Sequence, residues 1–192
     1  MNKVIKKNLI KNSILIKMHL INNICDINIL KFANKYYINN CIDYNNIRIR
    51  YYFAENKCID LSMQRILVND EAYPVRSRFA VNSNIDISTQ RILVNDKNVW
   101  VRSCLSKNSN VHISIQRILA NDRFDVRHSL AQNKNIDISI KEILVKDTDE
   151  SVCKAIWSRL SQNEKNMFID KIGNPSFRRE VSIRLSEEPE YI

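Results

Sequence analysis

Residues 85–110 read IDISTQRILVNDKNVWVRSCLSKNSN, and closely similar stretches flank them on both sides. Residues 59–84 read IDLSMQRILVNDEAYPVRSRFAVNSN, and residues 111–135 read VHISIQRILANDRFDVRHSLAQNKN. From Ile136 the pattern resumes as IDISIKEILVKDTDESVCKAIWSRLSQNEKN. Self-similarity at a fixed period of about 20–50 residues is typical of repeat architectures. The sequence therefore predicts a tandem array of small structural units.

The spacing of the repeat can be read from one position that recurs in every unit. Arginine occupies it at 50, 76, 102, 127 and 178, with Cys153 between the last two, so the intervals are 25 or 26 residues. About five to six units are predicted over residues 45–192. Residues 1–44 are predicted to be a basic helical cap, because residues 1–35 contain seven lysines and a single acidic residue, Asp26.

Each unit is predicted to hold two short helices. The first is expected to open at a serine (Ser62, Ser88, Ser114, Ser139), since serine accepts from exposed backbone donors, and Glu142 completes a capping box with Ser139. Apolar residues before and four after each serine have hydrophobic-staple spacing, and the following leucine extends the inward stripe. An Asp marks the turn. The second helix presents Val75 and Phe79, or their equivalents, on one face and ends near an asparagine that tolerates a left-handed turn.

Composition supports a helical, soluble chain without a catalytic motif. One glycine and three prolines among 192 residues favour helices over sheets or phosphate loops. Five cysteines without a CxxC spacing predict reduced thiols and a cytoplasmic protein, and no segment has the length of a signal peptide or membrane span. The three histidines have no metal-ligand spacing. We therefore expect no enzyme activity, cofactor, metal or small-molecule substrate, and no membrane association.

The stretches ILVNDKNVWVRSCLSKNSN and ILANDRFDVRHSLAQNKN resemble the leucine-rich repeat variant family, a neighbour of HEAT-like repeats. The resemblance rests on an apolar–leucine pair, an Asp, a Val-Arg dipeptide and a closing Asn. It implies an all-α, right-handed α-solenoid whose units pair an α-helix with a short α- or 3-10 helix. The chain departs from the family in lacking most of its prolines. The fourth unit also has Cys153 for arginine and four extra residues before Asn163, which are predicted to add about one helical turn.

Two polar ladders and two tryptophans are the candidate functional residues. The first ladder consists of arginines and aspartates that recur with the same period. It allows either a phosphate-binding track or structural Arg–Asp pairs between units, and the shared period favours the structural role. Its members are Arg50, Arg76, Arg102, Arg127, Arg178, Asp70, Asp96, Asp122 and Asp147. The second is expected on the outer side of the first helix, as a solvated face or a partner-binding surface; it comprises Gln64-Arg65, Gln90-Arg91 and Gln116-Arg117, replaced by Lys141-Glu142. Trp100 and Trp157 are candidate partner contacts.

These features favour a scaffold that binds a protein or peptide, since stacked repeats create extended surfaces. A small bacterial immunity or regulatory protein is one specific form of such a scaffold. The alternative is a nucleic-acid-binding solenoid that uses the basic N-terminal end and the arginine ladder.

Overall fold

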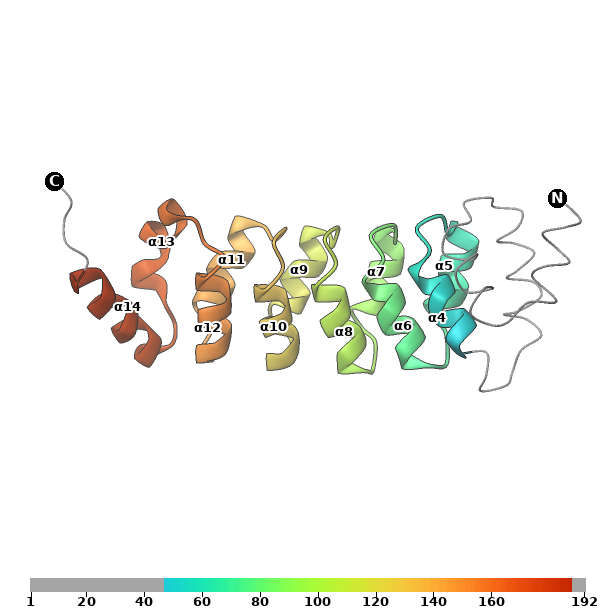
Figure 1. The fold of residues 1–192 in the computed structure, drawn as a ribbon, viewed down its shortest axis with the longest axis horizontal. Coiled ribbons are helices and arrows are strands. Elements are labelled where there is room, and N and C mark those ends of the chain that lie inside the picture. The colour runs from blue at the N-terminus through green and yellow to red at the C-terminus, as the bar shows by residue number, and fades with distance from the viewer. Residues whose placement is uncertain (1–46, 188–192) are drawn as a thin grey trace, which may run out of the picture.

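The computed structural model describes residues 47–187, and every regular element among them is a helix (Figure 1). The predicted cap, residues 1–44, lies outside the described residues. Four consecutive units each contain a first and a second helix. The first helices are α5 (Leu61–Leu67), α7 (Ile87–Leu93), α9 (Ile113–Leu119) and α11 (Ile138–Val145). The second helices are α6 (Tyr73–Ala80), α8 (Val99–Ser106), α10 (Phe124–Ala131) and α12 (Glu150–Trp157).

Helices at both ends extend this series. Before unit 1, α4 (Ile47–Glu55) packs on α6 as a second helix of an upstream unit. After unit 4, a fifth unit is formed by α13 (Gln162–Phe168), the 3-10 turn η3 (Ile169–Lys171) and α14 (Pro175–Glu187). Figure 1 shows first and second helices in two rows along one long axis, and each second helix packs on those of the adjacent units. The prediction of an all-α helical repeat solenoid is confirmed.

The core runs along the array between the two rows. The leucine of each first helix is fully buried, as predicted, and so are the paired apolar residues of each second helix, such as Val75 with Phe79 and Val101 with Leu105. Burying such a side chain stabilises the fold by about 1.5–3 kcal/mol. An eight-residue helix is not stable alone in water, so each unit depends on its neighbours.

The N-caps of the first helices lie two residues earlier than predicted and are different residues. Asp60, Asp86 and Asp137 are the N-caps, and His112 takes this place in unit 3. The carboxylate of Asp86 accepts from the N–H of Thr89 (2.8 Å) and from the hydroxyl of Ser88 (2.6 Å). Aspartate caps the helix in place of serine because its carboxylate accepts both bonds and places a negative charge at the helix N-terminus. The predicted serine caps are therefore wrong.

Three further local predictions are corrected. Glu142 does not form a capping box with Ser139, because its carboxylate binds Lys146 and Lys171; the capping box lies in α13, between Ser161 and Glu164. No described residue has a positive φ, so the closing asparagines do not adopt a left-handed turn. The residues before Asn163 add no helical turn to unit 4, since α12 has eight residues, like α6 and α8.

Candidate functional site

The ladder arginines join consecutive units. Arg76 donates from Nε (2.6 Å) and Nη2 (3.0 Å) to the two carboxylate oxygens of Asp96 in the next unit. Its Nη1 donates to the backbone carbonyl of Asp70 in its own unit (2.6 Å). The same paired contact joins Arg50 to Asp70, Arg102 to Asp122 and Arg127 to Asp147. These four guanidiniums are therefore engaged inside the protein.

The environment of the ladder keeps both partners ionised. Burial alone would raise the pKa of Asp96, but hydrogen bonds from Arg76 and the N–H of Asn98 hold this pKa below its ordinary value. Asp122 has a lowered pKa for the same reasons, with Arg102 as its partner. The hydrogen bond to Asp122 in turn raises the pKa of Arg102. Each pair is thus a charge-assisted, two-bond contact.

Glutamine forms a second structural ladder, which corrects its predicted outer position. Gln90 is buried, and its Nε2 donates to the carbonyl of Asn110 (3.1 Å) while its Oε1 accepts from the N–H of His112 (2.8 Å). The amide therefore bridges unit 2 to the segment that opens unit 3. Gln64 and Gln116 make the equivalent bonds one unit earlier and one unit later.

The closing asparagines form a third ladder that the sequence did not predict. Asn108 is 1% exposed, and its Nδ2 donates to the carbonyls of Ala80 and Asn82 in the preceding unit, each at 2.8 Å. Its Oδ1 accepts from the N–H of Asn110 (2.8 Å). Asn82 and Asn133 repeat this arrangement. The recurrence of Asn every 25–26 residues is the sequence signal that could have revealed this role.

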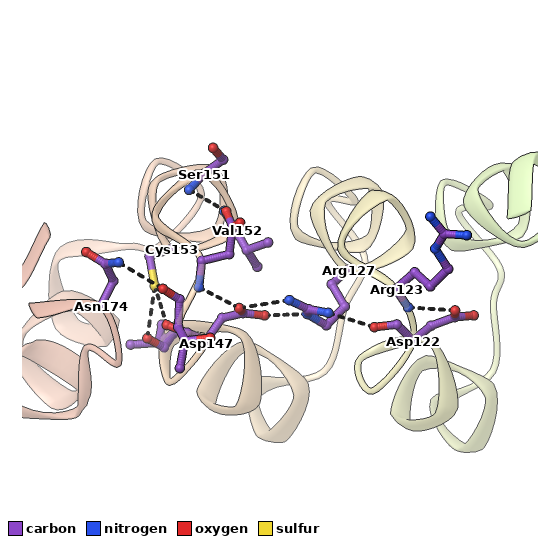
Figure 2. Close-up of polar contacts among 11 residues, drawn as sticks. Asp122, Arg123, Arg127, Asp147, Ser151, Val152, Cys153 and Asn174 are labelled. Atoms are coloured by element: carbon purple, nitrogen blue, oxygen red, sulfur yellow. Dashed lines mark hydrogen bonds and ion pairs between the residues drawn. The ribbon is translucent and has the colours of Figure 1, made fainter. Parts of the chain in front are cut away.

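All three ladders stop in unit 4. Lys141 replaces the glutamine and forms an ion pair with Glu164 (2.7 Å), and the exposed Arg159 stands two residues after α12, where an asparagine follows α6, α8 and α10. Figure 2 shows Arg127 reaching Asp147, whereas Cys153 at the next arginine position turns back to its own unit. Its thiol donates to the carbonyl of Asp147 (3.0 Å), the bond that Nη1 makes elsewhere. The bond within the unit is thus retained, and the ion pair to the next unit is lost.

A close backbone approach replaces the ion pair between units 4 and 5. Gly173 donates its N–H to the carbonyl of Val145 (2.9 Å), and a Cβ at this glycine would lie 2.0 Å from the carbonyl oxygen of Lys146. Asn174, also drawn in Figure 2, donates from Nδ2 to the carbonyl of Thr148 (2.8 Å). Arg178 is exposed and donates from Nε to the carbonyl of Ile172 (2.9 Å), so it forms no ladder pair with an Asp among the described residues.

The cysteines are not all reduced, contrary to the prediction. Cys58 is disulfide-bonded, whereas Cys104 and Cys153 are free thiols. Burial raises the pKa of both free thiols, which lowers their fraction of reactive thiolate.

Exposed apolar side chains recur on the solvent side of the first helices, and we call this side the first-helix face. It contains seven large apolar side chains, which are at least about one third exposed and recur at two positions of the repeat; they are Leu61, Ile66, Ile87, Ile92, Ile113, Ile118 and Ile138. The prediction that the isoleucines belong to the inward stripe is therefore wrong. Arg65, Arg91 and Arg117 are exposed beside them, while the adjacent glutamines are buried.

The two candidate tryptophans lie in different places. Trp100 is 66% exposed near the start of α8, and the exposed Tyr73 and Phe124 begin α6 and α10. Trp157 is half-buried at the end of α12 and packs edge-to-face on Phe177, with ring centroids 6.1 Å apart. Trp157 lines a cavity between units 4 and 5, far along the chain from Trp100.

The comparisons identify no relative: no family model, curated protein or solved structure matches this chain. Among residues 47–187, no group of three or more His, Cys, Asp or Glu side chains is placed to hold a metal ion. No helix in the same range is long and apolar enough to cross a membrane.

Proposed function

We propose that this chain is a non-enzymatic repeat scaffold that binds a protein or peptide along the first-helix face. The observation that carries the proposal is the row of exposed leucine and isoleucine side chains on α5, α7, α9 and α11. Isolated exposed apolar residues are ordinary, but exposed leucine or isoleucine at the same two positions of successive units is a repeated apolar feature of the kind that marks interaction sites.

The arginines beside this row suit the same role. Arg65, Arg91 and Arg117 are exposed at one repeated position, so they present a donor to the partner in each of units 1–3. Arginine is enriched in protein interfaces, where its stem covers apolar surface and its guanidinium binds carboxylates or backbone carbonyls. Apolar side chains and arginines that alternate along successive first helices favour an extended or helical protein segment as the ligand.

We further infer that the units are of the leucine-rich repeat variant type. The unit length of 25–26 residues, the ILVND segment and the Val-Arg site support this assignment. The first helices are α-helical, although η3 shows that a 3-10 turn occurs in unit 5. An experimental structure whose units form a right-handed superhelix would agree with the assignment, and a left-handed one would exclude it.

The binding proposal is tested by affinity capture from native cells after nuclease treatment. We expect the wild-type chain to retain a protein partner, and the triple variant Ile66→Thr, Ile92→Thr and Ile118→Thr to retain at least about tenfold less, since each buried isoleucine contributes about 1 kcal/mol or more. The matched control replaces three exposed apolar residues outside the face: Val81→Thr, Met167→Thr and Ile183→Thr. Equal capture by both triple variants would contradict the proposal.

The alternative is nucleic-acid binding through the basic N-terminal residues. The arginine ladder does not support it, because Arg50, Arg76, Arg102 and Arg127 already bind carboxylates of the array. The seven lysines of residues 1–35 are the observation that remains in its favour. Retention on DNA at low salt that falls steeply as salt rises, together with nuclease-sensitive capture, would favour this alternative over the scaffold.

A further inference from the structure

A cavity opens where the ladders stop. It lies between α12, α13 and α14 and has a volume of about 540 Å³, and we call it the C-terminal cavity. A second hollow of about 450 Å³ between α10 and α12 adjoins it, since Lys154 and Ser158 line both. Pockets that bind ligands usually measure about 300–1,000 Å³. In units 1–4 the ladders fix each unit against the next, whereas unit 5 is joined through other contacts and leaves this space.

The inner wall of the C-terminal cavity is apolar and aromatic. Trp157 and Phe177 meet edge-to-face at an interplanar angle of 85°, and Ile169 and Val181 complete the wall. Phe177 and Val181 are buried, so they form a fixed floor, while Trp157 is half-buried. An aromatic side chain packed against such a pair gains both apolar burial and ring contact.

Cations surround this apolar wall. Lys154 is bound to Glu150 (2.7 Å) and Glu180 (3.0 Å), and Arg184 is bound to Glu180 (2.6 Å). Lys165 lines the cavity and Arg159 lines the adjoining hollow, and neither forms an ion pair with another residue in the described range 47–187. Two cations are thus available for a ligand, Lys165 in the C-terminal cavity and Arg159 in the adjoining hollow.

We propose that the C-terminal cavity binds an acidic peptide segment of a partner protein that carries an aromatic residue. The aromatic side chain packs against Trp157 and Phe177, and flanking carboxylates bind Lys165 and Arg159. Charge complementarity selects the acidic peptide, because the two hollows are lined by four Lys or Arg side chains and one carboxylate, Glu180. That carboxylate accepts from a peptide N–H but repels the closely spaced phosphates of a nucleic acid. The site is separate from the first-helix face, so it goes beyond the proposed function.

Calorimetric titration of the full chain with three short peptides tests this proposal. We expect acetyl-EEFEE-amide to bind with a Kd on the order of 10–100 μM, as suits a short peptide with a single anchor. The peptide without the ring, acetyl-EESEE-amide, should bind at least about tenfold more weakly. The charge-reversed acetyl-KKFKK-amide should not bind, and rising salt should weaken the binding of the acidic peptide.

A double variant and a matched control locate the binding. Arg159→Gln with Lys165→Gln should weaken the affinity for acetyl-EEFEE-amide by about fivefold, since the change removes both cations that bind the flanking carboxylates. Arg123→Gln with Lys134→Gln removes the same charges elsewhere and should leave the affinity unchanged. Equal affinity of both variants, tight binding of acetyl-KKFKK-amide, or tighter binding of oligo(dT) than of the acidic peptide would overturn the proposal.

The chain's own acidic residues 188–192, EPEYI, are the rival occupant of the C-terminal cavity. A chain that ends at Glu187 distinguishes the two. Unchanged affinity of this shortened chain for acetyl-EEFEE-amide is the result expected for a site that serves a partner. An affinity at least about tenfold higher would assign the cavity to residues 188–192 and overturn the assignment to a partner.

Discussion

A ladder arginine joins two units because its guanidinium has donors on two edges. In Arg102 the edge formed by Nε and Nη2 faces Asp122 of the following unit, and Nη1 faces the carbonyl of Asp96 in its own unit. The shared period of Arg and Asp predicted that each arginine has a carboxylate partner available. It did not identify which carboxylate is the partner. Arg102 pairs with Asp122, 20 residues downstream, and not with the carboxylate of Asp96, six residues upstream.

Replacing Arg102 with alanine should lower the free energy of unfolding by about 2–4 kcal/mol. The change leaves Asp122 as a largely buried carboxylate without its cation and leaves the Asp96 carbonyl without its donor. Urea denaturation measures the difference. The control is Arg91→Ala, an exposed residue of the first-helix face, which should change stability by no more than about 0.5 kcal/mol. Similar losses in both variants would show that the ladder is not a structural contact.

The ladder also predicts how stability depends on pH. The pKa values of Asp96 and Asp122 are lower in the folded chain than their ordinary values, so the folded state binds fewer protons at these sites. Their contribution is therefore complete above the unfolded pKa of about 4 and is lost as the pH falls through the folded pKa. The urea midpoint should therefore drop as the pH falls below about 4. In Asp96→Asn with Asp122→Asn this drop should be smaller; an identical pH profile would contradict the assignment.

The buried amides show where prediction from residue types fails. Gln90 and Asn108 are polar, so helical periodicity assigns them to solvent or to a turn. Their burial is favourable only because backbone carbonyls and N–H groups of a neighbouring unit lie within hydrogen-bond reach. That geometry arises from stacking and is not visible within one unit.

At the scale of elements, the repeat predicted both helices of each unit and their buried faces. It misplaced the helix starts because Asp and Ser are both strong N-caps and stand two residues apart, as in Asp86 and Ser88. It assigned Ile92 to the inward stripe because this isoleucine has hydrophobic-staple spacing from Ser88, but the N-cap is Asp86, so that spacing does not apply. The sequence also indicated a break at Cys153, but not the cavity beside it.

Gly173→Ala should destabilise the junction of units 4 and 5 by about 2 kcal/mol or more. The new methyl group would lie 2.0 Å from the Lys146 carbonyl oxygen, so the loop before α14 must move away from α11. Thermal unfolding followed by circular dichroism measures the loss. Asn121→Ala, an exposed change in unit 3, is the control. A melting temperature equal to that of the wild type would show that this close approach does not hold unit 5.

At the scale of the whole molecule, three ladders hold units 1–4 as one array, and a different interface attaches unit 5. Stability in such arrays is approximately a sum of unit and nearest-neighbour terms, so units can open separately. The array could be predicted from the sequence because its signal recurs in every unit. The cavity could not, since it depends on how unit 5 sits against α12.

Native-state hydrogen exchange of the full chain tests this organisation most directly. Amides of α13 and α14 should exchange with an opening free energy at least about 2 kcal/mol lower than those of α8 and α10, because no ladder bond crosses from unit 4 to unit 5. The helix α4 is the control for end effects, since Arg50 and Asn82 bind it to unit 1; it should be better protected than α14. Protection of α13 and α14 equal to that of α8 and α10 would contradict the claim that the ladders define the array.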